Sequence, residues 1–197
     1  MRSKDRTQTM KHIATVALML NLGVAGVYAQ QRPVKMTFSG TLGDRPFNIL
    51  PNTVTVEQVV AGDGTLGPFT FTELHADPAS PQPSSSCSPG PYFPTVAGAG
   101  VFRFQDGSLL TVTVMEGAIC VDLTAGAAGV AHDTVSYQIT GGTGRFKDAS
   151  GTLTLTATAH PVLRNASVAV PLDSYTGEFQ GTVSGAAIGE DGQDARR

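Results

Sequence analysis

The stretch YQITGGTGRFKDASGTLTL, from Tyr137 to Leu155, decides the fold of this chain. A dinucleotide-binding loop would need the spacing G-x-G-x-x-G and then a helix whose N-terminus faces the pyrophosphate. Counted from Gly142, the last glycine position holds Lys147, and a strand-like run of alternating threonines follows. No Gly-Lys-Ser/Thr follows at the Walker spacing either. Nucleotide binding is therefore not expected.

We interpret the glycines instead as a structural corner between two strands. Glycine tolerates positive φ at the point where a strand leaves its sheet. We expect the segment RFKDAS to make a short turn, with Phe146 packing back on the core before the next strand. The glycines of this corner are Gly141, Gly142, Gly144 and Gly151.

Outward from this corner, most of the chain alternates apolar and polar residues with a period of two. Such alternation gives a strand one buried and one solvated face, as in antiparallel sheets. Asp106-Gly107 between two alternating runs is a strong hairpin signal. Helical periodicity is nearly absent. The expected strands are residues 34–40, 52–60, 68–73, 100–105, 108–117, 118–123, 133–140, 151–160 and 174–185.

The pattern predicts an all-β protein, a single antiparallel β-barrel of eight strands, or eight to nine, over residues 30–185. A two-sheet Greek-key sandwich is the main alternative. The Pro- and Ser-rich segment 78–94 is expected to be a long loop, anchored by Cys87. Residues 186–197 have no apolar anchor and are expected to be a disordered tail.

Residues 1–29 read as a cleaved secretory signal peptide. Basic residues are followed by an apolar stretch, and small residues precede a cleavage site after Ala29. The alternative, a membrane anchor, is disfavoured because the apolar run falls short of about 20 residues. We therefore expect a secreted or periplasmic protein that is not embedded in a membrane after cleavage.

The charge and cysteine content of the remaining chain narrow its partners. Cleavage removes four of 13 basic and one of 16 acidic residues, so nine and fifteen remain, a net charge of −6. No basic cluster survives, and nucleic acid is therefore not an expected partner. Cys87 and Cys120 most simply form a disulfide in an exported protein, although a reactive thiol is the alternative. A homo-oligomer is possible but cannot be read from the sequence.

The segment ITGGTGRFKDASGTLTL resembles the glycine motif of the allene oxide cyclase and dirigent superfamily of calycin-like β-barrels. A closer likeness is to bacterial exported proteins that carry GGTGRF-x-x-A-x-G and end in F-x-G-T-[VL]-S-G. The resemblance implies an eight-stranded antiparallel barrel with an apolar interior. The matching positions are Gly141, Gly142, Thr143, Gly144, Phe146, Ala149 and Gly151, and then Phe179, Gly181, Thr182, Val183, Ser184 and Gly185.

The resemblance does not bring an active site with it, because activity does not follow from fold. Cyclases of the superfamily place a glutamate on the first strand, whereas the run VKMTFSGTL has no acid before Asp44. We therefore expect an exported barrel that binds a small apolar ligand, without cofactor or metal. Small inward residues, Ala157, Ala159, Gly177 and Gly181, could leave room for it. An isomerase or cyclase-like enzyme is the alternative.

Three ionisable positions remain as weak catalytic candidates: Glu73, His75 and Asp122. In FTFTELHAD, Glu73, His75 and Asp77 are spaced by two and would share one face of a continuing strand, where they could move a proton or hold a metal. The favoured alternative ends the strand near Glu73 and leaves the other two in a solvated loop. Asp122 would be a buried acid only if its face points inward. His132-Asp133 reads as a turn.

Overall fold

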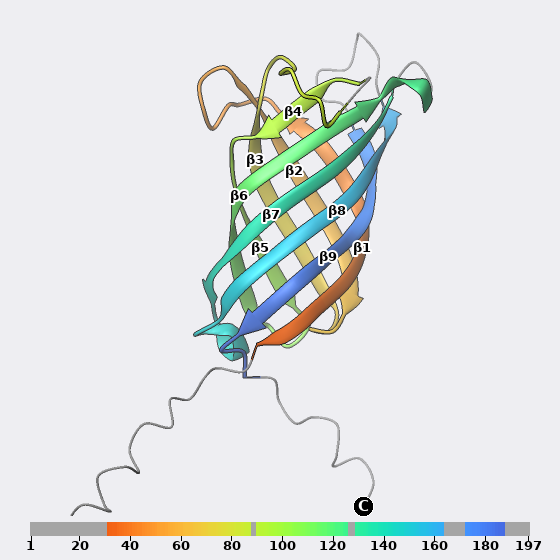
Figure 1. The fold of residues 1–197 in the computed structure, drawn as a ribbon. Coiled ribbons are helices and arrows are strands. Elements are labelled where there is room, and N and C mark those ends of the chain that lie inside the picture. Colours follow the sequence, from red (N-terminus) through yellow and green to blue (C-terminus); the bar gives the residue numbers. More distant parts are fainter. Residues whose placement is uncertain (1–30, 88–89, 126–128, 164–171, 188–197) are drawn as a thin grey trace, which may run out of the picture.

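The computed structural model describes residues 31–87, 90–125, 129–163 and 172–187. The expected signal peptide and almost all of the expected tail lie outside these residues. Nine strands and two short 3₁₀ turns make up the described part (Figure 1). The strands are β1 (Arg32–Arg45), β2 (Thr53–Gly64), β3 (Phe69–Pro78), β4 (Tyr92–Thr95), β5 (Ala97–Phe104), β6 (Leu109–Asp122), β7 (Val130–Gly142), β8 (Ser150–Leu163) and β9 (Leu172–Ser184).

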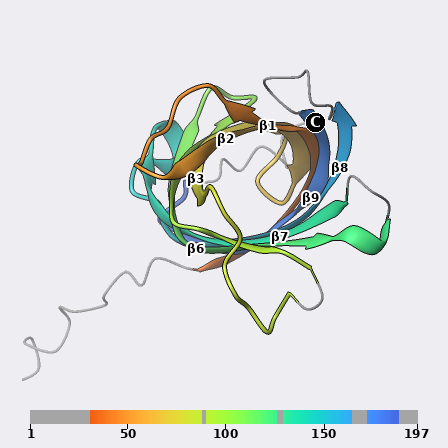
Figure 2. The same cartoon turned by 90° about the horizontal axis from the view of Figure 1, so that it is seen from above.

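Eight of these strands close into one antiparallel barrel, as seen along its axis in Figure 2. The ring runs β1-β2-β3-β5-β6-β7-β8-β9, and β9 pairs with β1. The pairing of β6 with β7 completes the ring. The barrel prediction is confirmed, and the sandwich alternative is wrong, because a continuous ladder of hydrogen bonds joins all eight strands.

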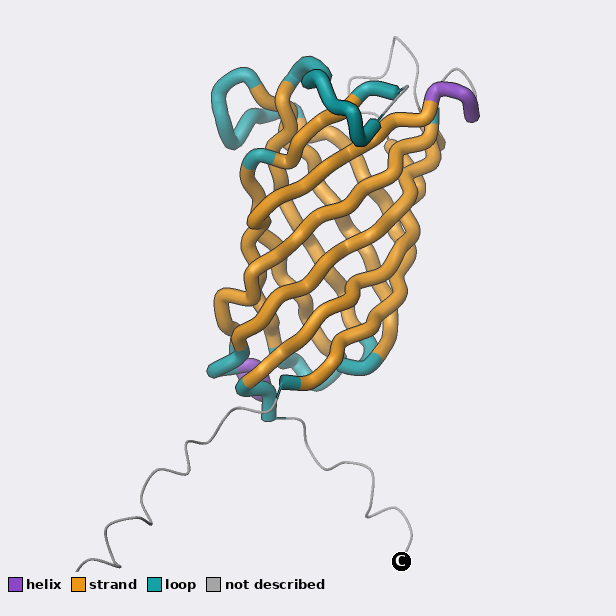
Figure 3. The backbone as a smooth tube through the Cα atoms, in the orientation of Figure 1, coloured by secondary structure: helices purple, strands orange, loops and turns teal. Residues whose placement is uncertain are grey.

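The strand boundaries differ from expectation in three places (Figure 3). The run AICVDL is not a separate strand but continues β6, past a register shift between Val114 and Glu116. Within the expected Pro/Ser loop, β4 pairs with the upper half of β6. β3 runs on to Pro78, because β2 and β5 pair with its far half. In each case a neighbouring strand extends pairing beyond what local pattern shows.

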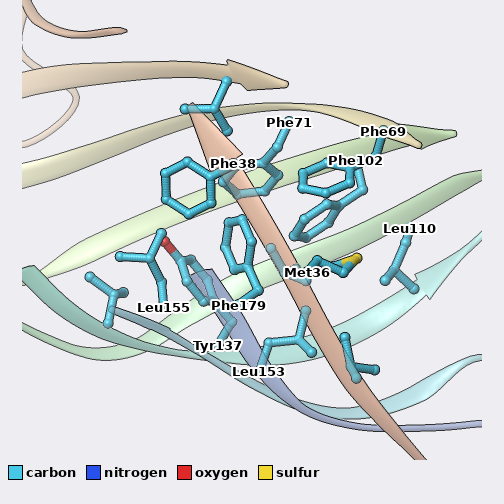
Figure 4. Close-up of a cluster of buried hydrophobic side chains, with 14 of the residues drawn as sticks. Met36, Phe38, Phe69, Phe71, Phe102, Leu110, Tyr137, Leu153, Leu155 and Phe179 are labelled. Carbon is cyan, nitrogen blue, oxygen red and sulfur yellow. The ribbon is translucent and has the colours of Figure 1, made fainter. Parts of the chain in front are cut away.

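The middle of the barrel is packed with aromatic and aliphatic side chains (Figure 4). The ring of Phe179 lies at the centre, 4.9 Å from Phe102, 5.0 Å from Phe38 and 5.1 Å from Phe71 between ring centroids. Phe38 lies on β1, Phe71 on β3 and Phe102 on β5. Tilted and edge-on aromatic pairs at these distances add stabilisation beyond buried area. This part of the interior is a solid core and not a ligand cavity.

The glycine-rich stretch forms the corner between β7 and β8 at the end of the barrel that is lower in Figure 1. Gly141, Gly144 and Gly151 have φ of 129°, 58° and 138°, a region that favours glycine. Thr143 hydrogen-bonds to Leu109 through both its backbone N–H and its hydroxyl oxygen. The motif therefore turns the chain and fastens the turn to β6.

Arg145 of the same motif covers the lower end of the core. Its guanidinium lies over the rings of Phe104 and Phe146, 4.8 Å and 4.6 Å from their centroids. It also donates a hydrogen bond to the carbonyl of Leu66 and lies 3.2 Å from the carboxylate of Asp106. Cation–π contacts and the ion pair together hold this residue across three connections between strands. The motif thus closes one end of the barrel.

A disulfide joins Cys87 to Cys120, with 5.2 Å between their Cα atoms, which confirms the predicted pairing. Cys120 lies on β6 beside the short strand β4, where it pairs with Tyr92. The bond and the β4–β6 ladder together fix the Pro/Ser segment to the upper end of the barrel.

No helix in the described ranges has the length and apolar character needed to cross a membrane.

Candidate functional site

A cavity of about 220 Å³ lies at the upper end of the barrel, opposite the glycine corner. Six of the eight barrel strands and β4 contribute to its walls. Most of the lining is apolar, and a group of ionisable side chains joins it. The apolar residues are Leu42, Val54, Val56, Pro78, Ala79, Phe93, Ile119, Val121 and Ala131, and the ionisable ones are Asp44, His75, Asp77, Asp133 and Asp173.

His75 and Asp77 reach this cavity because β3 keeps its alternation to its end. Phe69, Phe71, Glu73, His75 and Asp77 are all buried on its inward face. The expectation that the strand ends near Glu73 is therefore wrong. β2 and β5 pair with β3 as far as Ala76, and β2 to its end, so the inward register is maintained.

Two glycines on β5 make room for these side chains. Gly98 pairs with His75 and Gly100 with Glu73. A Cβ atom at Gly98 would lie 2.8 Å from the Cβ of His75 and 3.2 Å from Oε1 of Glu73. A Cβ atom at Gly100 would lie 2.4 Å from the ring of Phe71. The AGAG sequence of β5 therefore leaves the space that the polar residues of β3 occupy.

Two buried tyrosines orient two of the carboxylates. The hydroxyl of Tyr137 donates a hydrogen bond of 2.6 Å to Oε2 of Glu73, and that of Tyr175 donates one of 2.8 Å to Oδ2 of Asp133. Burial raises the pKa of both tyrosines well above the usual value, and the neighbouring carboxylates raise it further. Both phenols therefore remain protonated donors.

His75 lies between two carboxylates of its own strand. Its Nδ1 is 3.6 Å from Oε1 of Glu73, and its Nε2 is 3.4 Å from Oδ2 of Asp77. Burial alone would lower the pKa of His75, but interactions with Asp77 and Glu73 outweigh it and raise the pKa to about 10. His75 is thus an imidazolium at neutral pH. It can supply positive charge or a proton, but it is not a free base.

Asp133 is a buried carboxyl whose pKa is raised toward neutrality. Burial raises its pKa to about 6, although the hydrogen bond from Tyr175 and the charge of His75 act in the opposite direction. The sequence reading of His132-Asp133 as a turn is wrong, because both residues lie within β7. Asp133 shares the inward parity of Val135 and Tyr137, and this parity is the sequence signal that could have revealed it.

Several buried polar atoms around the cavity have no hydrogen-bond partner. They are Oδ1 of Asp77, Oδ1 of Asp133 and Nε2 of His75 among the residues that line it, and Oε1 of the neighbouring Glu73. Buried carboxylate oxygens without donors are unfavourable, so such atoms mark a place where a donor is expected. Over the described residues, no group of three or more His, Cys, Asp or Glu side chains is arranged to hold a metal ion.

The three sequence candidates lie in two different places. Glu73 and His75 meet in the barrel interior, and His75 lines the cavity. Asp122 lies at the end of β6, half-buried, where its carboxylate accepts hydrogen bonds from the hydroxyl and N–H of Thr124. These bonds lower the pKa of Asp122. Asp122 was a catalytic candidate only if it pointed into the barrel, and it does not lie on the inward face of β6.

The small inward residues lie elsewhere than expected. Ala157 and Ala159 are part of the packed core, and none of the four small residues lines the cavity. Gly177 and Gly181 instead allow close approach of β8: a Cβ atom would lie 2.4 Å from the carbonyl of Thr156 and 2.1 Å from that of Thr152, respectively.

Comparison with known proteins does not assign the chain to a family. No protein-family model and no curated protein matches it. It is similar to the solved structure of the pterocarpan synthase dirigent protein GePTS1, at 12% identity and a TM-score of 0.34, over 77% of this chain and 84% of that one. At this TM-score the likeness carries no argument. Membership of the bacterial GGTGRF group stays a prediction.

Proposed function

We propose that the protein binds a small molecule in the cavity at the upper end of its barrel. The ligand has a largely apolar body and at least one group that donates hydrogen bonds. The observation that carries this proposal is the position of Asp77 and Asp133: each lines a mostly apolar cavity, and each has a buried oxygen without a hydrogen-bond partner. Apolar walls with a few polar groups are typical of small-molecule sites.

The size of the cavity limits the ligand. Its volume of about 220 Å³ lies below the range of about 300–1,000 Å³ typical of sites for drug-sized molecules. A molecule of one ring, or a short branched chain, suits it best. Phe93 on β4 pairs with Ile119 on β6, and both line the cavity, so the strand beside the disulfide contributes to the wall.

A variant that fills the cavity tests this proposal. Ala131→Phe places a large ring in the cavity wall, and Ala61→Phe places the same ring on the exposed face of β2 as a matched control. Protein purified from its native source is analysed by native mass spectrometry, and retained molecules are extracted. We expect a ligand on the wild type and on Ala61→Phe but not on Ala131→Phe. Recovery of nothing from any of the three, or equal recovery from all, contradicts the proposal.

A second candidate function is acid–base catalysis of an isomerase or cyclase type. It is favoured by the pKa of about 6 for Asp133, which makes its carboxylate a base near neutral pH, beside the imidazolium of His75. If the retained molecule is turned over, Asp133→Asn should abolish turnover even at a saturating concentration of that molecule. Unchanged turnover in that variant would rule out Asp133 as the base.

We also propose that the chain is exported after removal of residues 1–29. The disulfide between Cys87 and Cys120 supports this proposal, because disulfides persist in oxidising compartments.

A further inference from the structure

We infer that the ligand is a small organic cation, an amine whose ammonium group binds Asp77 and Asp133 while its hydrocarbon part contacts the apolar wall. This inference rests on the proposed cavity and specifies the class of molecule that occupies it. It follows from the balance of charge around the cavity, from the kind of polar atoms left unpartnered there, and from the nature of the walls.

The charge at the inner side of the cavity is negative. His75 supplies one positive charge, and Glu73, Asp77 and Asp133 supply three carboxyl groups against it. Asp44 and Asp173 bring two further carboxyl groups to the cavity wall. Glu73 and Asp77 act on His75 as negative charges and already compensate it on both ring nitrogens. The hydrogen bond that Asp133 accepts comes from the neutral hydroxyl of Tyr175, and the charge of His75 acts on it without a direct ion pair. A cation reduces this excess, whereas an anionic ligand would increase it.

The unpartnered oxygens point to a ligand with several donors. Oδ1 of Asp77 and Oδ1 of Asp133 are both fully buried, in side chains that are 6% and 3% exposed. A primary ammonium carries three N–H donors and no acceptor, so one group has enough donors for both oxygens. A hydroxyl has a single O–H, so it can donate to only one of the two oxygens at a time. Charge-assisted bonds are about twice as strong as neutral ones.

The apolar part of the cavity wall suits a hydrocarbon group. Val54, Val56, Ile119 and Val121 supply branched aliphatic surface, and Phe93 supplies a ring. Burial of such a body contributes roughly 25 cal/mol per Å² of apolar surface removed from water. An amine with one ring or a short branched chain therefore satisfies both the walls and the carboxylates, whereas a metal ion would leave the apolar surface uncovered.

Binding of an amine is expected to depend on pH through Asp133. The groups that act on this carboxyl are Tyr175 on β9 and Glu73, His75 and Asp77 on β3. Since its pKa is raised to about 6, Asp133 loses its negative charge as the pH falls below that value, while His75 keeps its positive charge. The affinity for an amine should therefore fall between pH 7.5 and pH 5.

A series of matched probes tests the inference on the intact wild-type protein. Phenethylamine, 2-phenylethanol and phenylacetate share one body and differ in their head group, and benzylamine and cyclohexylamine with their alcohol and acid counterparts vary the body. Binding is measured by calorimetry at pH 7.5 and at pH 5. We expect an amine to bind at least tenfold more tightly than its alcohol, its acid not to bind, and the preference to shrink at pH 5.

Substitutions then show which carboxylates cause the preference for an amine over its alcohol. Asp133→Asn should weaken amine binding about tenfold or more and leave the alcohol within about threefold. The exposed Asp63→Asn, at the opposite end of β2, should change neither. If Asp133→Asn does not fold, Asp77→Asn serves in its place, and the probe series on the wild type needs no variant at all.

The outcomes separate the inference that the ligand is an amine from the proposal that the cavity binds a small molecule. An alcohol or acid that binds as tightly as its amine overturns the cation while leaving the small-molecule cavity standing. An amine preference that persists unchanged in Asp133→Asn and in Asp77→Asn, or that is the same at both pH values, also overturns it. Failure of every probe in the series to bind contradicts the cavity proposal itself.

Discussion

Tyr137 is a single residue on which a buried carboxylate depends. Its hydroxyl is the hydrogen-bond donor to Oε2 of Glu73, whose other oxygen, Oε1, has no hydrogen-bond partner. Both side chains are 1% exposed. The removal of one oxygen atom therefore leaves a buried carboxylate dependent on His75 alone.

We expect Tyr137→Phe to lower the free energy of unfolding by about 1–3 kcal/mol, since a buried acceptor loses its donor. Urea denaturation at pH 7 measures the loss. The control is Tyr92→Phe, which removes the same atom from a half-buried residue at the upper end. Equal stability of the two variants would show that the bond to Glu73 contributes nothing.

The side chain of His75 should also remain protonated well above neutral pH. We expect its ring nitrogens to show imidazolium ¹⁵N chemical shifts at pH 8, because Asp77 and Glu73 outweigh the effect of burial and raise its pKa to about 10. Titration of this ring near the unperturbed value of 6.5 would disprove the ion-pair assignment.

The stability of the folded protein should depend on pH, because folding raises the pKa of both His75 and Asp133. The folded state holds the His75 proton more tightly than the unfolded state, so this contribution is complete below pH 6.5 and is lost as the pH rises toward about 10. Asp133 acts in the same direction between pH 3.8 and about 6, since its folded-state pKa is also raised. These two groups should make the protein less stable as the pH rises through each window, as denaturation across pH would show.

At the scale of elements, β3, β4 and the disulfide determine the upper end. β3 brings the ionisable residues inward, and the β4–β6 ladder places Phe93 in the wall. The disulfide links Cys87, in the segment that precedes β4, to β6. The position of β4 in the cavity wall should therefore depend on the disulfide between Cys87 and Cys120.

Replacement of both Cys87 and Cys120 by serine should lower the free energy of unfolding by about 3–4 kcal/mol, for a sequence separation of 33 residues. We expect reductant to destabilise the wild type by a similar amount and to leave the double variant unchanged. Urea denaturation with and without reductant gives both numbers. A loss within about 0.5 kcal/mol, the range of ordinary surface substitutions, would contradict this role.

At the scale of the whole molecule, the two ends of the barrel differ. The glycine motif and Arg145 close the lower end over a solid aromatic core. The upper end keeps a cavity with ionisable groups at its inner side. A ligand that binds the barrel should therefore enter from the end that carries β4 and the disulfide.

The mature protein should lack residues 1–29 of the sequence. We expect intact-mass analysis of the protein from the periplasm or medium to give a chain that begins at Gln30, because the signal pattern places cleavage after Ala29. The Cys87–Cys120 bond should be intact in the same sample. A chain in that fraction that still begins at Met1 would contradict export with cleavage.

The sequence alone determined the fold class and the disulfide partners. Alternation with period two marks one inward and one outward face on each strand, so local pattern suffices for Phe69, Phe71, Val135 and Tyr137. The absence of a helix after the glycines likewise separated a corner from a phosphate loop. The alternation and the glycine corner are local features of consecutive residues, whereas the disulfide followed from there being only two cysteines.

Only the tertiary structure decided where the ionisable residues lie. Charged residues on an inward face contradict the pattern that identifies a strand, so the end of β3 read as a loop until β2 and β5 were seen to pair with it. The partners that make burial tolerable, Tyr137 for Glu73 and Tyr175 for Asp133, are 64 and 42 residues away. A buried charge is stable only with such partners, and closure of the barrel is what brings them together.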